Sequence, residues 1–185
     1  MAEPALKEAT YDDLFTIPEH HVGQILEGVL YSHPRPAFPH AQAASVLGEE
    51  LGPPFKRGRG GPGGWIILGE PELHLGRDVL VPDLAGWKRE RLPEMPGTAA
   101  TVAPDWICEV LSPSTAHIDR IRKLPIYARE NVQHAWLIDP VAQTLEVFEL
   151  QNGRYSLAQT AEGEQRGHFI PFDAIELDLA LLWRW

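Results

Sequence analysis

The sequence has little of what several functional classes require. Cys108 is its single cysteine, which excludes an internal disulfide and any paired-cysteine metal or redox motif. No apolar run approaches the roughly 20 residues that a membrane-spanning helix needs. The opening residues, MAEPALKEATYDD, contain neither the basic start nor the apolar stretch of a signal peptide. These absences predict a cytoplasmic protein without membrane contact.

The sequence also lacks an excess of basic residues. Its formal net charge of −10 argues against a protein that coats nucleic acid without specificity. The middle of the chain differs, because residues 56–123 hold 10 basic and 9 acidic side chains. Nine of the 16 lysines and arginines fall in three short runs, Lys56-Arg57-Arg59, Lys88-Arg89-Arg91 and Arg120-Arg122-Lys123. Folding could gather these runs into one positive face, or leave them as three solvated loops.

The remaining composition favours one α/β domain. Hydrophobic residues make up 44% of the chain, and neither a repeat nor a linker divides residues 1–185. Residues 1–9 are expected to be flexible. Strand signals lie on both sides of a central helical segment, and hairpin signals stand at both ends. We therefore predict a central mixed β-sheet flanked by helices, with additional N- and C-terminal β-hairpins.

Helix and strand signals alternate along the chain. Thr10 is placed to cap a short helix, and residues 24–33 are typical of two strands around a glycine turn. Residues 40–51 are helical by composition. The glycine-rich stretch 53–64 predicts a mobile surface loop, since it lacks the Gly-Lys-Ser/Thr ending of a phosphate-binding P-loop. Later strands are expected within the segments 65–87, 106–111, 134–139 and 144–159.

The central helix is predicted from Thr115 to Glu130. Pro125 should kink this helix or end its first part. Asp119, Lys123 and Tyr127 are spaced four residues apart and form a polar seam along it. The opposite side carries an apolar stripe of Ile118, Ile121, Leu124 and Ala128. If the stripe packs on the sheet, the seam faces solvent or skirts the edge of the sheet.

Two carboxylates interrupt segments that are otherwise apolar. Within residues 79–87, strand periodicity places Asp83 on one face with Ala85 and Trp87, and Glu109 interrupts WICEVL in the same way. Burying an unpaired carboxylate costs several kcal/mol, so each needs a cation, a hydrogen-bond network or a metal. Neither segment contains a lysine or arginine. The partner must come from elsewhere, and Lys123 on the polar seam is a candidate.

The residues themselves leave two interpretations open. Two carboxylates and one amine are the minimum set for metal-assisted hydrolysis of a phosphodiester. Oxygen ligands suit Mg²⁺, and a lysine can position water and stabilise developing charge. Alternatively, a buried Lys123–Glu109 pair joins the helix to a strand, and Asp83 caps a turn after Pro82.

Several segments resemble a known family, in the family's own order. They are LEGVLYSHPRP, HAQAASVLGEELGPPF, GGWIILGEPELHLG, VLVPDLAGWKRER, APDWICEVLSPST, IDRIRKLPIYA and HAWLIDP. Together they resemble the Uma-type restriction endonuclease family, a domain of unknown function in the PD-(D/E)XK nuclease superfamily. The likeness runs from about Tyr11 to Trp183. It implies a restriction-endonuclease-like fold with a Mg²⁺-dependent nuclease site, in which Mn²⁺ could substitute.

The resemblance assigns the catalytic residues one by one. Pro82-Asp83 stands at the PD, Glu109 stands at the acidic residue of (D/E)XK, and the Val110 backbone carbonyl is implied as a third metal ligand. Leu111 occupies the position of the expected lysine. The family supplies the amine from the following helix, which points to Lys123 as the third catalytic residue.

The resemblance also implies supporting residues. Gln24 stands where the family often has an acidic residue, and an amide can still ligate or hydrogen-bond but removes a negative charge. Glu27 cannot replace it simply, because it lies three residues on and, in a strand, on the opposite face. Asp119 and Tyr127 are expected to support the amine. His40 either approaches phosphate or caps and packs its helix.

The resulting hypothesis is an endonuclease that hydrolyses DNA phosphodiester bonds with Mg²⁺ and without a nucleotide cofactor. The alternative is a non-catalytic nuclease-like protein that serves as a nucleic-acid or protein interaction module, for example as a homodimer. The acidic composition, Gln24 and Leu111 favour the alternative. The set of Asp83, Glu109 and Lys123 favours the enzyme.

Overall fold

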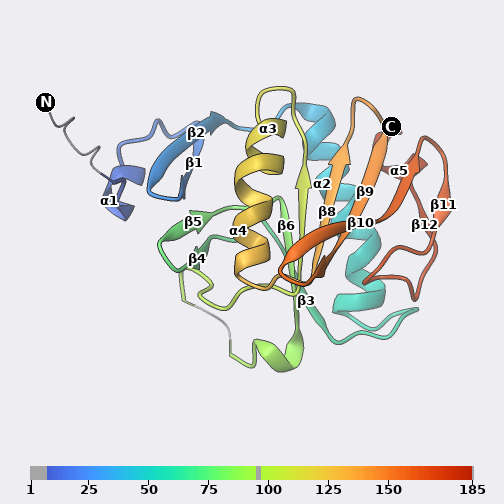
Figure 1. Ribbon diagram of the computed structural model, residues 1–185. Coiled ribbons are helices and arrows are strands. Elements are labelled where there is room, and N and C mark those ends of the chain that lie inside the picture. Colours follow the sequence, from blue (N-terminus) through green and yellow to red (C-terminus); the bar gives the residue numbers. More distant parts are fainter. Residues whose placement is uncertain (1–7, 95–96, 185) are drawn as a thin grey trace, which may run out of the picture.

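A computed structural model describes residues 8–94 and 97–184 of the chain. The expected flexibility of the N-terminus falls mainly on residues 1–7, which lie outside the described residues. A six-stranded sheet stands between two helical layers, with a smaller sheet beside it (Figure 1). The predicted α/β fold, a central mixed sheet flanked by helices, is confirmed.

The six-stranded sheet has the order β10-β9-β8-β7-β6-β3. Its two central strands β7 and β8 run parallel, and every other neighbouring pair is antiparallel. The predicted C-terminal hairpin is present at one edge and turns at Asn152-Gly153, with both residues at positive φ. The strands are β3 (Trp65–Gly69), β6 (Leu84–Lys88), β7 (Trp106–Val110), β8 (His134–Asp139), β9 (Thr144–Gln151) and β10 (Arg154–Glu162).

The smaller sheet has four strands in the order β2-β1-β5-β4. The predicted N-terminal hairpin is present, and its turn uses Glu27 and Gly28, both at positive φ. The short helix α1 (Tyr11–Leu14) follows Thr10, also as predicted. The strands are β1 (His21–Leu26), β2 (Val29–Pro34), β4 (Leu73–Leu75) and β5 (Asp78–Leu80).

The prediction that residues 79–87 form one strand is wrong. β5 ends at Leu80 in the smaller sheet, and β6 begins at Leu84 in the larger one. Pro82 lies between them, and a proline cannot donate a hydrogen bond to a strand ladder. Asp83 therefore lies in the connection between two sheets, where strand periodicity does not fix its direction.

Helix α2 (Phe38–Leu51) covers one face of the large sheet (Figure 1). Its residues Ala43, Leu47 and Leu51 are fully buried and form the side of the helix that packs on the core. The helix continues into a wide π-type turn, η1 (Gly52–Lys56), so the loop predicted from Pro53 begins later. Phe55 is buried in the core and holds this turn against the sheet.

The opposite face is covered by one helical segment made of α3 (Ala116–Ile118), a π-type turn η3 (Asp119–Lys123) and α4 (Leu124–Arg129). It is drawn as a single column in front of the sheet in Figure 1. The wide turn lies just before Pro125, which has no N–H to donate. The helical segment continues through Pro125 without a loop.

The predicted orientation of this helix is wrong. Ile121 of the supposed inner stripe is 65% exposed, whereas Asp119, Lys123 and Tyr127 of the supposed outer seam are buried. The physical reason is Glu109, which points at the helix from the sheet. Turning the apolar stripe inward would have left this carboxylate without a partner.

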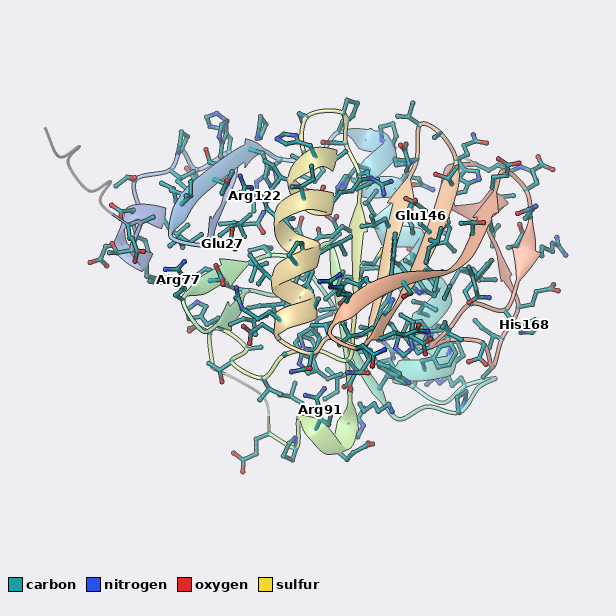
Figure 2. All side chains as sticks on the ribbon, in the orientation of Figure 1. Glu27, Arg77, Arg91, Arg122, Glu146 and His168 are labelled. Carbon is teal, nitrogen blue, oxygen red and sulfur yellow. The ribbon has the colours of Figure 1, made fainter. Side chains whose placement is uncertain are left out.

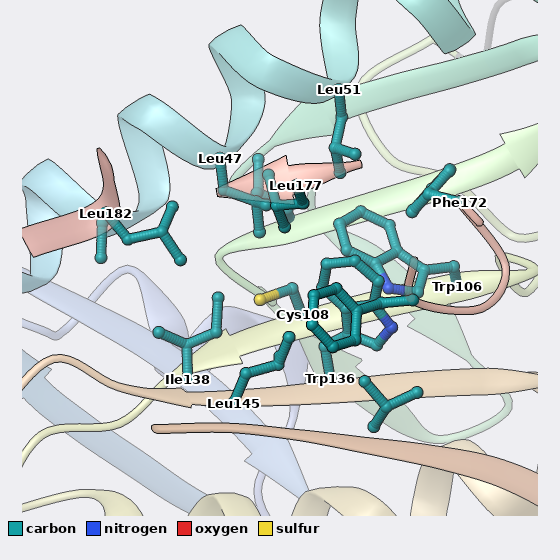
Figure 3. Close-up of a cluster of buried hydrophobic side chains, with 14 of the residues drawn as sticks. Leu47, Leu51, Trp106, Cys108, Trp136, Ile138, Leu145, Phe172, Leu177 and Leu182 are labelled. Atoms are coloured by element: carbon teal, nitrogen blue, oxygen red, sulfur yellow. The ribbon is translucent and has the colours of Figure 1, made fainter. Parts of the chain in front are cut away.

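The C-terminal part closes the aromatic side of the core. It contains β11 (Arg166–Gly167), β12 (Leu177–Asp178) and α5 (Ala180–Trp183). Elsewhere in the chain, a 3₁₀ turn η2 (Arg89–Arg91) lies between β6 and β7. Trp106, Trp136 and Phe172 pack with aliphatic residues of α2 and α5 on the face of the sheet that α2 covers (Figure 3). Among the described residues, no helix combines the length and apolar character needed to cross a membrane.

Candidate active site

Strand β7 places Glu109 toward the helix that contains Asp119 and Tyr127. Its neighbours Cys108 and Val110 point the other way, into the aromatic core, because successive side chains of a strand alternate. Glu109 is only 1% exposed. Its Oε1 accepts a 2.7 Å hydrogen bond from the Tyr127 hydroxyl, and its Oε2 lies 3.0 Å from Lys123 Nζ. The carboxylate predicted at this position is therefore buried and partnered.

Lys123 is held between two carboxylates. Its Nζ lies 2.8 Å from Asp119 Oδ1, one helical turn back, in addition to the contact with Glu109. All three side chains are at least 95% buried. Lys123 is the one lysine or arginine that is buried within residues 8–94 and 97–184. Asp119, Lys123 and Tyr127 of the polar seam therefore form a buried cluster of four residues together with Glu109.

The balance of charge in this cluster shifts the pKa of its members. Burial raises the pKa of Glu109 to about 8, and the charges of Asp119 and Asp83 act in the same direction against Lys123. Burial alone would lower the pKa of Lys123, but Glu109 and Asp119 together raise it. The lysine is therefore an ammonium at neutral pH. Three carboxyl groups, those of Asp83, Asp119 and Glu109, surround this one ammonium.

Asp83 joins the cluster from the connection between the two sheets. Its Oδ2 accepts a 2.7 Å hydrogen bond from the backbone N–H of Val110, which fixes it beside the end of β7. Its Oδ1 lies 3.3 Å from Nε2 of His40. Burial lowers the pKa of His40, but Asp83 raises it more, so that the net shift is upward. His40 lies inside α2 after the N-cap Ala37, so it does not cap the helix.

A cavity of about 300 Å³ opens onto these groups. The predicted residues that line it are Asp83, Glu109, Val110, Lys123, Asp119 and His40. Tyr127 is behind Glu109 and does not line it. The structure therefore brings together the carboxylates, the amine and the backbone group that the sequence singled out.

Gln24 is placed differently from the expectation. It is buried and does not line the cavity. Its side-chain oxygen accepts a 2.9 Å hydrogen bond from the backbone N–H of Val81. Gln24 thus anchors the connection that holds Asp83. Glu27 sits at the hairpin turn and pairs with Arg122 at 3.7 Å, outside the cavity.

Glu70 is a cavity residue that sequence reasoning missed. It lies between Gly69 and Pro71, and its backbone N–H donates a 3.0 Å hydrogen bond to the Asp83 carbonyl. Its φ of 48° is in the left-handed region, which is unusual for a residue other than glycine. Such strain is frequent at functional sites, but the sequence offers no sign of it beyond the Gly-Glu-Pro turn signal.

The donor set fits a hard divalent cation. Asp83, Glu109 and the Val110 carbonyl offer oxygen atoms, the ligand type that such cations prefer. Within the described parts of the chain, no three His, Cys, Asp or Glu side chains are arranged as a ready-made metal cluster. Mg²⁺ does not need one, because it commonly uses one or two carboxylates and keeps several waters.

The basic runs do not form one positive face. Arg120 pairs with Glu146, and Arg122 pairs with Glu27. Glu27 and Glu146 lie on opposite sides of the helical column in Figure 2. Arg91 pairs with Asp105 at 2.8 Å. Lys123 of the third run is buried in the cluster. Lys56 and Arg57 remain at the end of α2, near the candidate site.

Comparison with known proteins identifies the family. The model of the Uma2 family, described as "Putative restriction endonuclease", matches residues 11–181. The chain belongs to the Uma2 family. A search of the curated proteins found no match. Among solved structures, this Uma2 chain is similar to a protein from Anabaena variabilis ATCC 29413, described as "a putative nuclease belonging to DUF820".

The likeness to the Anabaena protein extends over the whole fold. The TM-score is 0.77 at 22% sequence identity, and the alignment covers 95% of this chain and 97% of the other. An identity this low establishes the fold alone. The activity of the Uma2 chain must be argued from its own site residues.

Proposed function

We propose that the protein is a metal-dependent endonuclease that hydrolyses DNA phosphodiester bonds, with Mg²⁺ as its metal. The observation that carries the proposal is the Lys123 ammonium, held by Glu109 and Asp119 in a cavity that Asp83 also lines. An ammonium beside paired carboxylates is the arrangement that metal-assisted phosphoryl chemistry requires. Membership of a family described as a restriction endonuclease supports the same assignment.

Each residue has a distinct role in this proposal. Asp83, Glu109 and the Val110 carbonyl would hold the ion, which when bound supplies a water of lowered pKa and neutralises a phosphate oxygen. The Lys123 ammonium orients the attacking water and stabilises charge on the phosphate. The water oxygen then bonds to phosphorus as the phosphorus–oxygen bond to the leaving sugar breaks. The attacking water gives one proton to solvent and the leaving oxygen takes one from solvent, so the products are a phosphate monoester and a free hydroxyl.

Two further residues act through the catalytic ones. Asp119 holds Lys123 in place at 2.8 Å, and Tyr127 holds Glu109 at 2.7 Å. Asp119 and Tyr127 are both buried, so a change of rotamer at either side chain would disrupt the packing around it. They are positioning residues, since neither needs to contact the substrate.

The test is cleavage of supercoiled plasmid and of single-stranded DNA with Mg²⁺ or Mn²⁺. Asp83→Asn and Lys123→Met should each lower the rate by a factor of about 10² to 10³, the usual cost of losing one electrostatic group. Asp12→Asn, an exposed carboxylate on α1, serves as the matched control and should cleave like the wild type. Full activity in Asp83→Asn would contradict the proposal.

One observation favours a second candidate, a non-catalytic nuclease-like interaction module. His40 lies against Asp83, and both oxygens of Glu109 already have protein partners. The carboxyl groups of Asp83 and Glu109 thus have partners without a metal. Isothermal titration with Mg²⁺ and Mn²⁺ separates the candidates, because a module of this kind would bind neither ion at Asp83. Binding that is lost in Asp83→Asn would support the enzyme.

A further inference from the structure

A second cavity adjoins the candidate active site along α2. Its volume is about 540 Å³. It shares four lining residues with the site cavity, namely Pro36, His40, Glu70 and Asp83. The two hollows therefore form one continuous groove that passes Asp83 and runs between α2 and strand β3.

The far end of this groove is basic. Lys56 and Arg57 line it there, at the end of the η1 turn. Lys56 Nζ donates a 2.9 Å hydrogen bond to the backbone carbonyl of Ile67, which fixes the ammonium on β3. An ammonium has three protons to donate, so two remain for a ligand.

These two cations differ from several other basic residues of the protein. Arg91, Arg120 and Arg122 each form an ion pair with an acidic side chain. Within residues 8–94 and 97–184, neither Lys56 nor Arg57 does so. Glu70 and Asp83 are the acidic residues that line the second cavity, and the Glu70 backbone N–H donates to the Asp83 carbonyl, which places both at the metal end. The groove therefore runs from negative to positive, with unpaired cations at its far end.

The length of the groove matches a short stretch of nucleic acid. Ile67 carries the Lys56 contact, and Glu70 three residues later carries the Asp83 contact. At about 3.3 Å per strand residue, these contacts are roughly 10 Å apart. Successive phosphates of a DNA strand lie further apart than the axial rise of about 3.4 Å per nucleotide, because the backbone winds around the axis, so one or two nucleotides cover this distance.

We propose that this groove binds the backbone of the DNA strand on one side of the phosphate to be cleaved, and that Lys56 and Arg57 each contact a phosphate roughly one or two nucleotides away. The inference rests on the proposed function for the identity of the ligand. It adds a defined backbone subsite outside the Asp83–Glu109–Lys123 cluster. A protein with a net charge of −10 thereby gains local attraction for a polyanion where the site needs it.

The test measures binding without cleavage. Fluorescein-labelled single-stranded and duplex DNA of about 20 nucleotides is titrated in EDTA at several salt concentrations. The variant is Lys56→Gln with Arg57→Gln, and the matched control is Arg59→Gln. Arg59 is an exposed arginine of the same loop that does not line the groove. Melting curves of all proteins verify folding.

Loss of two phosphate contacts should flatten the plot of log affinity against log salt. The expected change in slope is about 1.4 for single strands and 1.8 for duplex, while Arg59→Gln keeps the wild-type slope. An unchanged slope in the double variant, an equal change in Arg59→Gln, or no DNA binding by the wild type would each overturn the subsite.

The outcome is separable from that of the proposed function. If the wild type cleaves DNA but the double variant keeps its slope, the subsite fails and the nuclease stands. If the double variant loses slope but the wild type never cleaves with Mg²⁺ or Mn²⁺, the subsite stands as a DNA-binding groove and the nuclease assignment fails.

Discussion

Strand β7 separates two regions of opposite character. On one face, Trp106 and Cys108 point into a layer of aromatic and aliphatic side chains that α2 and the C-terminal segment close (Figure 3). On the other face, Glu109 points at Asp119 and Lys123 of the covering helix. Both faces are buried, but the first buries only apolar side chains, whereas the second buries the charged cluster beside apolar residues such as Ile107.

The difference shows what each region is for. Apolar burial stabilises the fold whatever the pH, because no group there changes its charge near neutrality. A buried charge cluster gains little net stability over a hydrophobic replacement of similar size, and it becomes costly when one partner is lost. A cluster of this kind beside a cavity is therefore explained better by chemistry than by folding.

Removing an aromatic ring from the apolar face should have the largest effect on stability. Trp136 is fully buried and its indole N–H donates to the Ile170 carbonyl at 2.7 Å. Trp136→Ala should lower the free energy of unfolding by about 3–5 kcal/mol, through lost packing and a residual cavity. Urea denaturation at pH 5 and pH 8 should give the same loss. A loss that depends strongly on pH would contradict the expected difference between the apolar face and the charged face.

Removing the cation from the charged face should cost nearly as much, but only at higher pH. Lys123→Met leaves Glu109 and Asp119 without their counter-ion, and we expect a loss of about 3 kcal/mol at pH 8.5. The loss should be smaller at pH 5, because Glu109 can then take up a proton. The reference is Lys88→Met, which removes an exposed lysine and is denatured under the same conditions. Equal losses at the two pH values would contradict the assigned charge cluster.

Glu109→Gln removes the titratable carboxyl group and so tests whether Glu109 causes the pH dependence of stability. The folded-state pKa of Glu109 is raised from 4.5 to about 8, so its protonated form is the one that folding favours. Its contribution to stability is complete below pH 4.5 and is lost as the pH rises toward 8. The wild type should therefore lose several kcal/mol of stability across this range. Glu109→Gln should lose less, whereas the exposed Glu162→Gln should follow the wild type.

Two tyrosine variants should give the smallest effects and compare the two kinds of hydrogen bond. Tyr127 donates to the Glu109 carboxylate at 2.7 Å, and Tyr155 donates to the neutral Val132 carbonyl at 2.8 Å. Tyr127→Phe should cost about 1.5–3 kcal/mol above pH 8, where Glu109 is ionised, and less at pH 5. Tyr155→Phe should cost about 1 kcal/mol at either pH. Thermal denaturation at the two pH values tests the difference.

Much of the fold could be predicted from local patterns. The turn signals at Gly28 and Asn152-Gly153 indicate both hairpins, and the apolar residues of 40–51 indicate α2. The failures have local causes as well. Pro82 breaks a segment that otherwise reads as one strand. The stripe of Ile118 and Ile121 looks like a buried face until a carboxylate from another strand competes for it.

The sequence by itself supplied the groups of the candidate site. It contains a carboxylate in each of two apolar segments and a lysine on a seam with Asp119 and Tyr127, and the cost of burying a carboxylate predicted that each needs a partner. Tertiary structure alone decided how they meet. It turned the seam inward, placed His40 and Glu70 beside Asp83, and opened the groove to Lys56. Side-chain periodicity describes one element at a time, whereas the pairing of buried charges is settled between elements far apart in the chain.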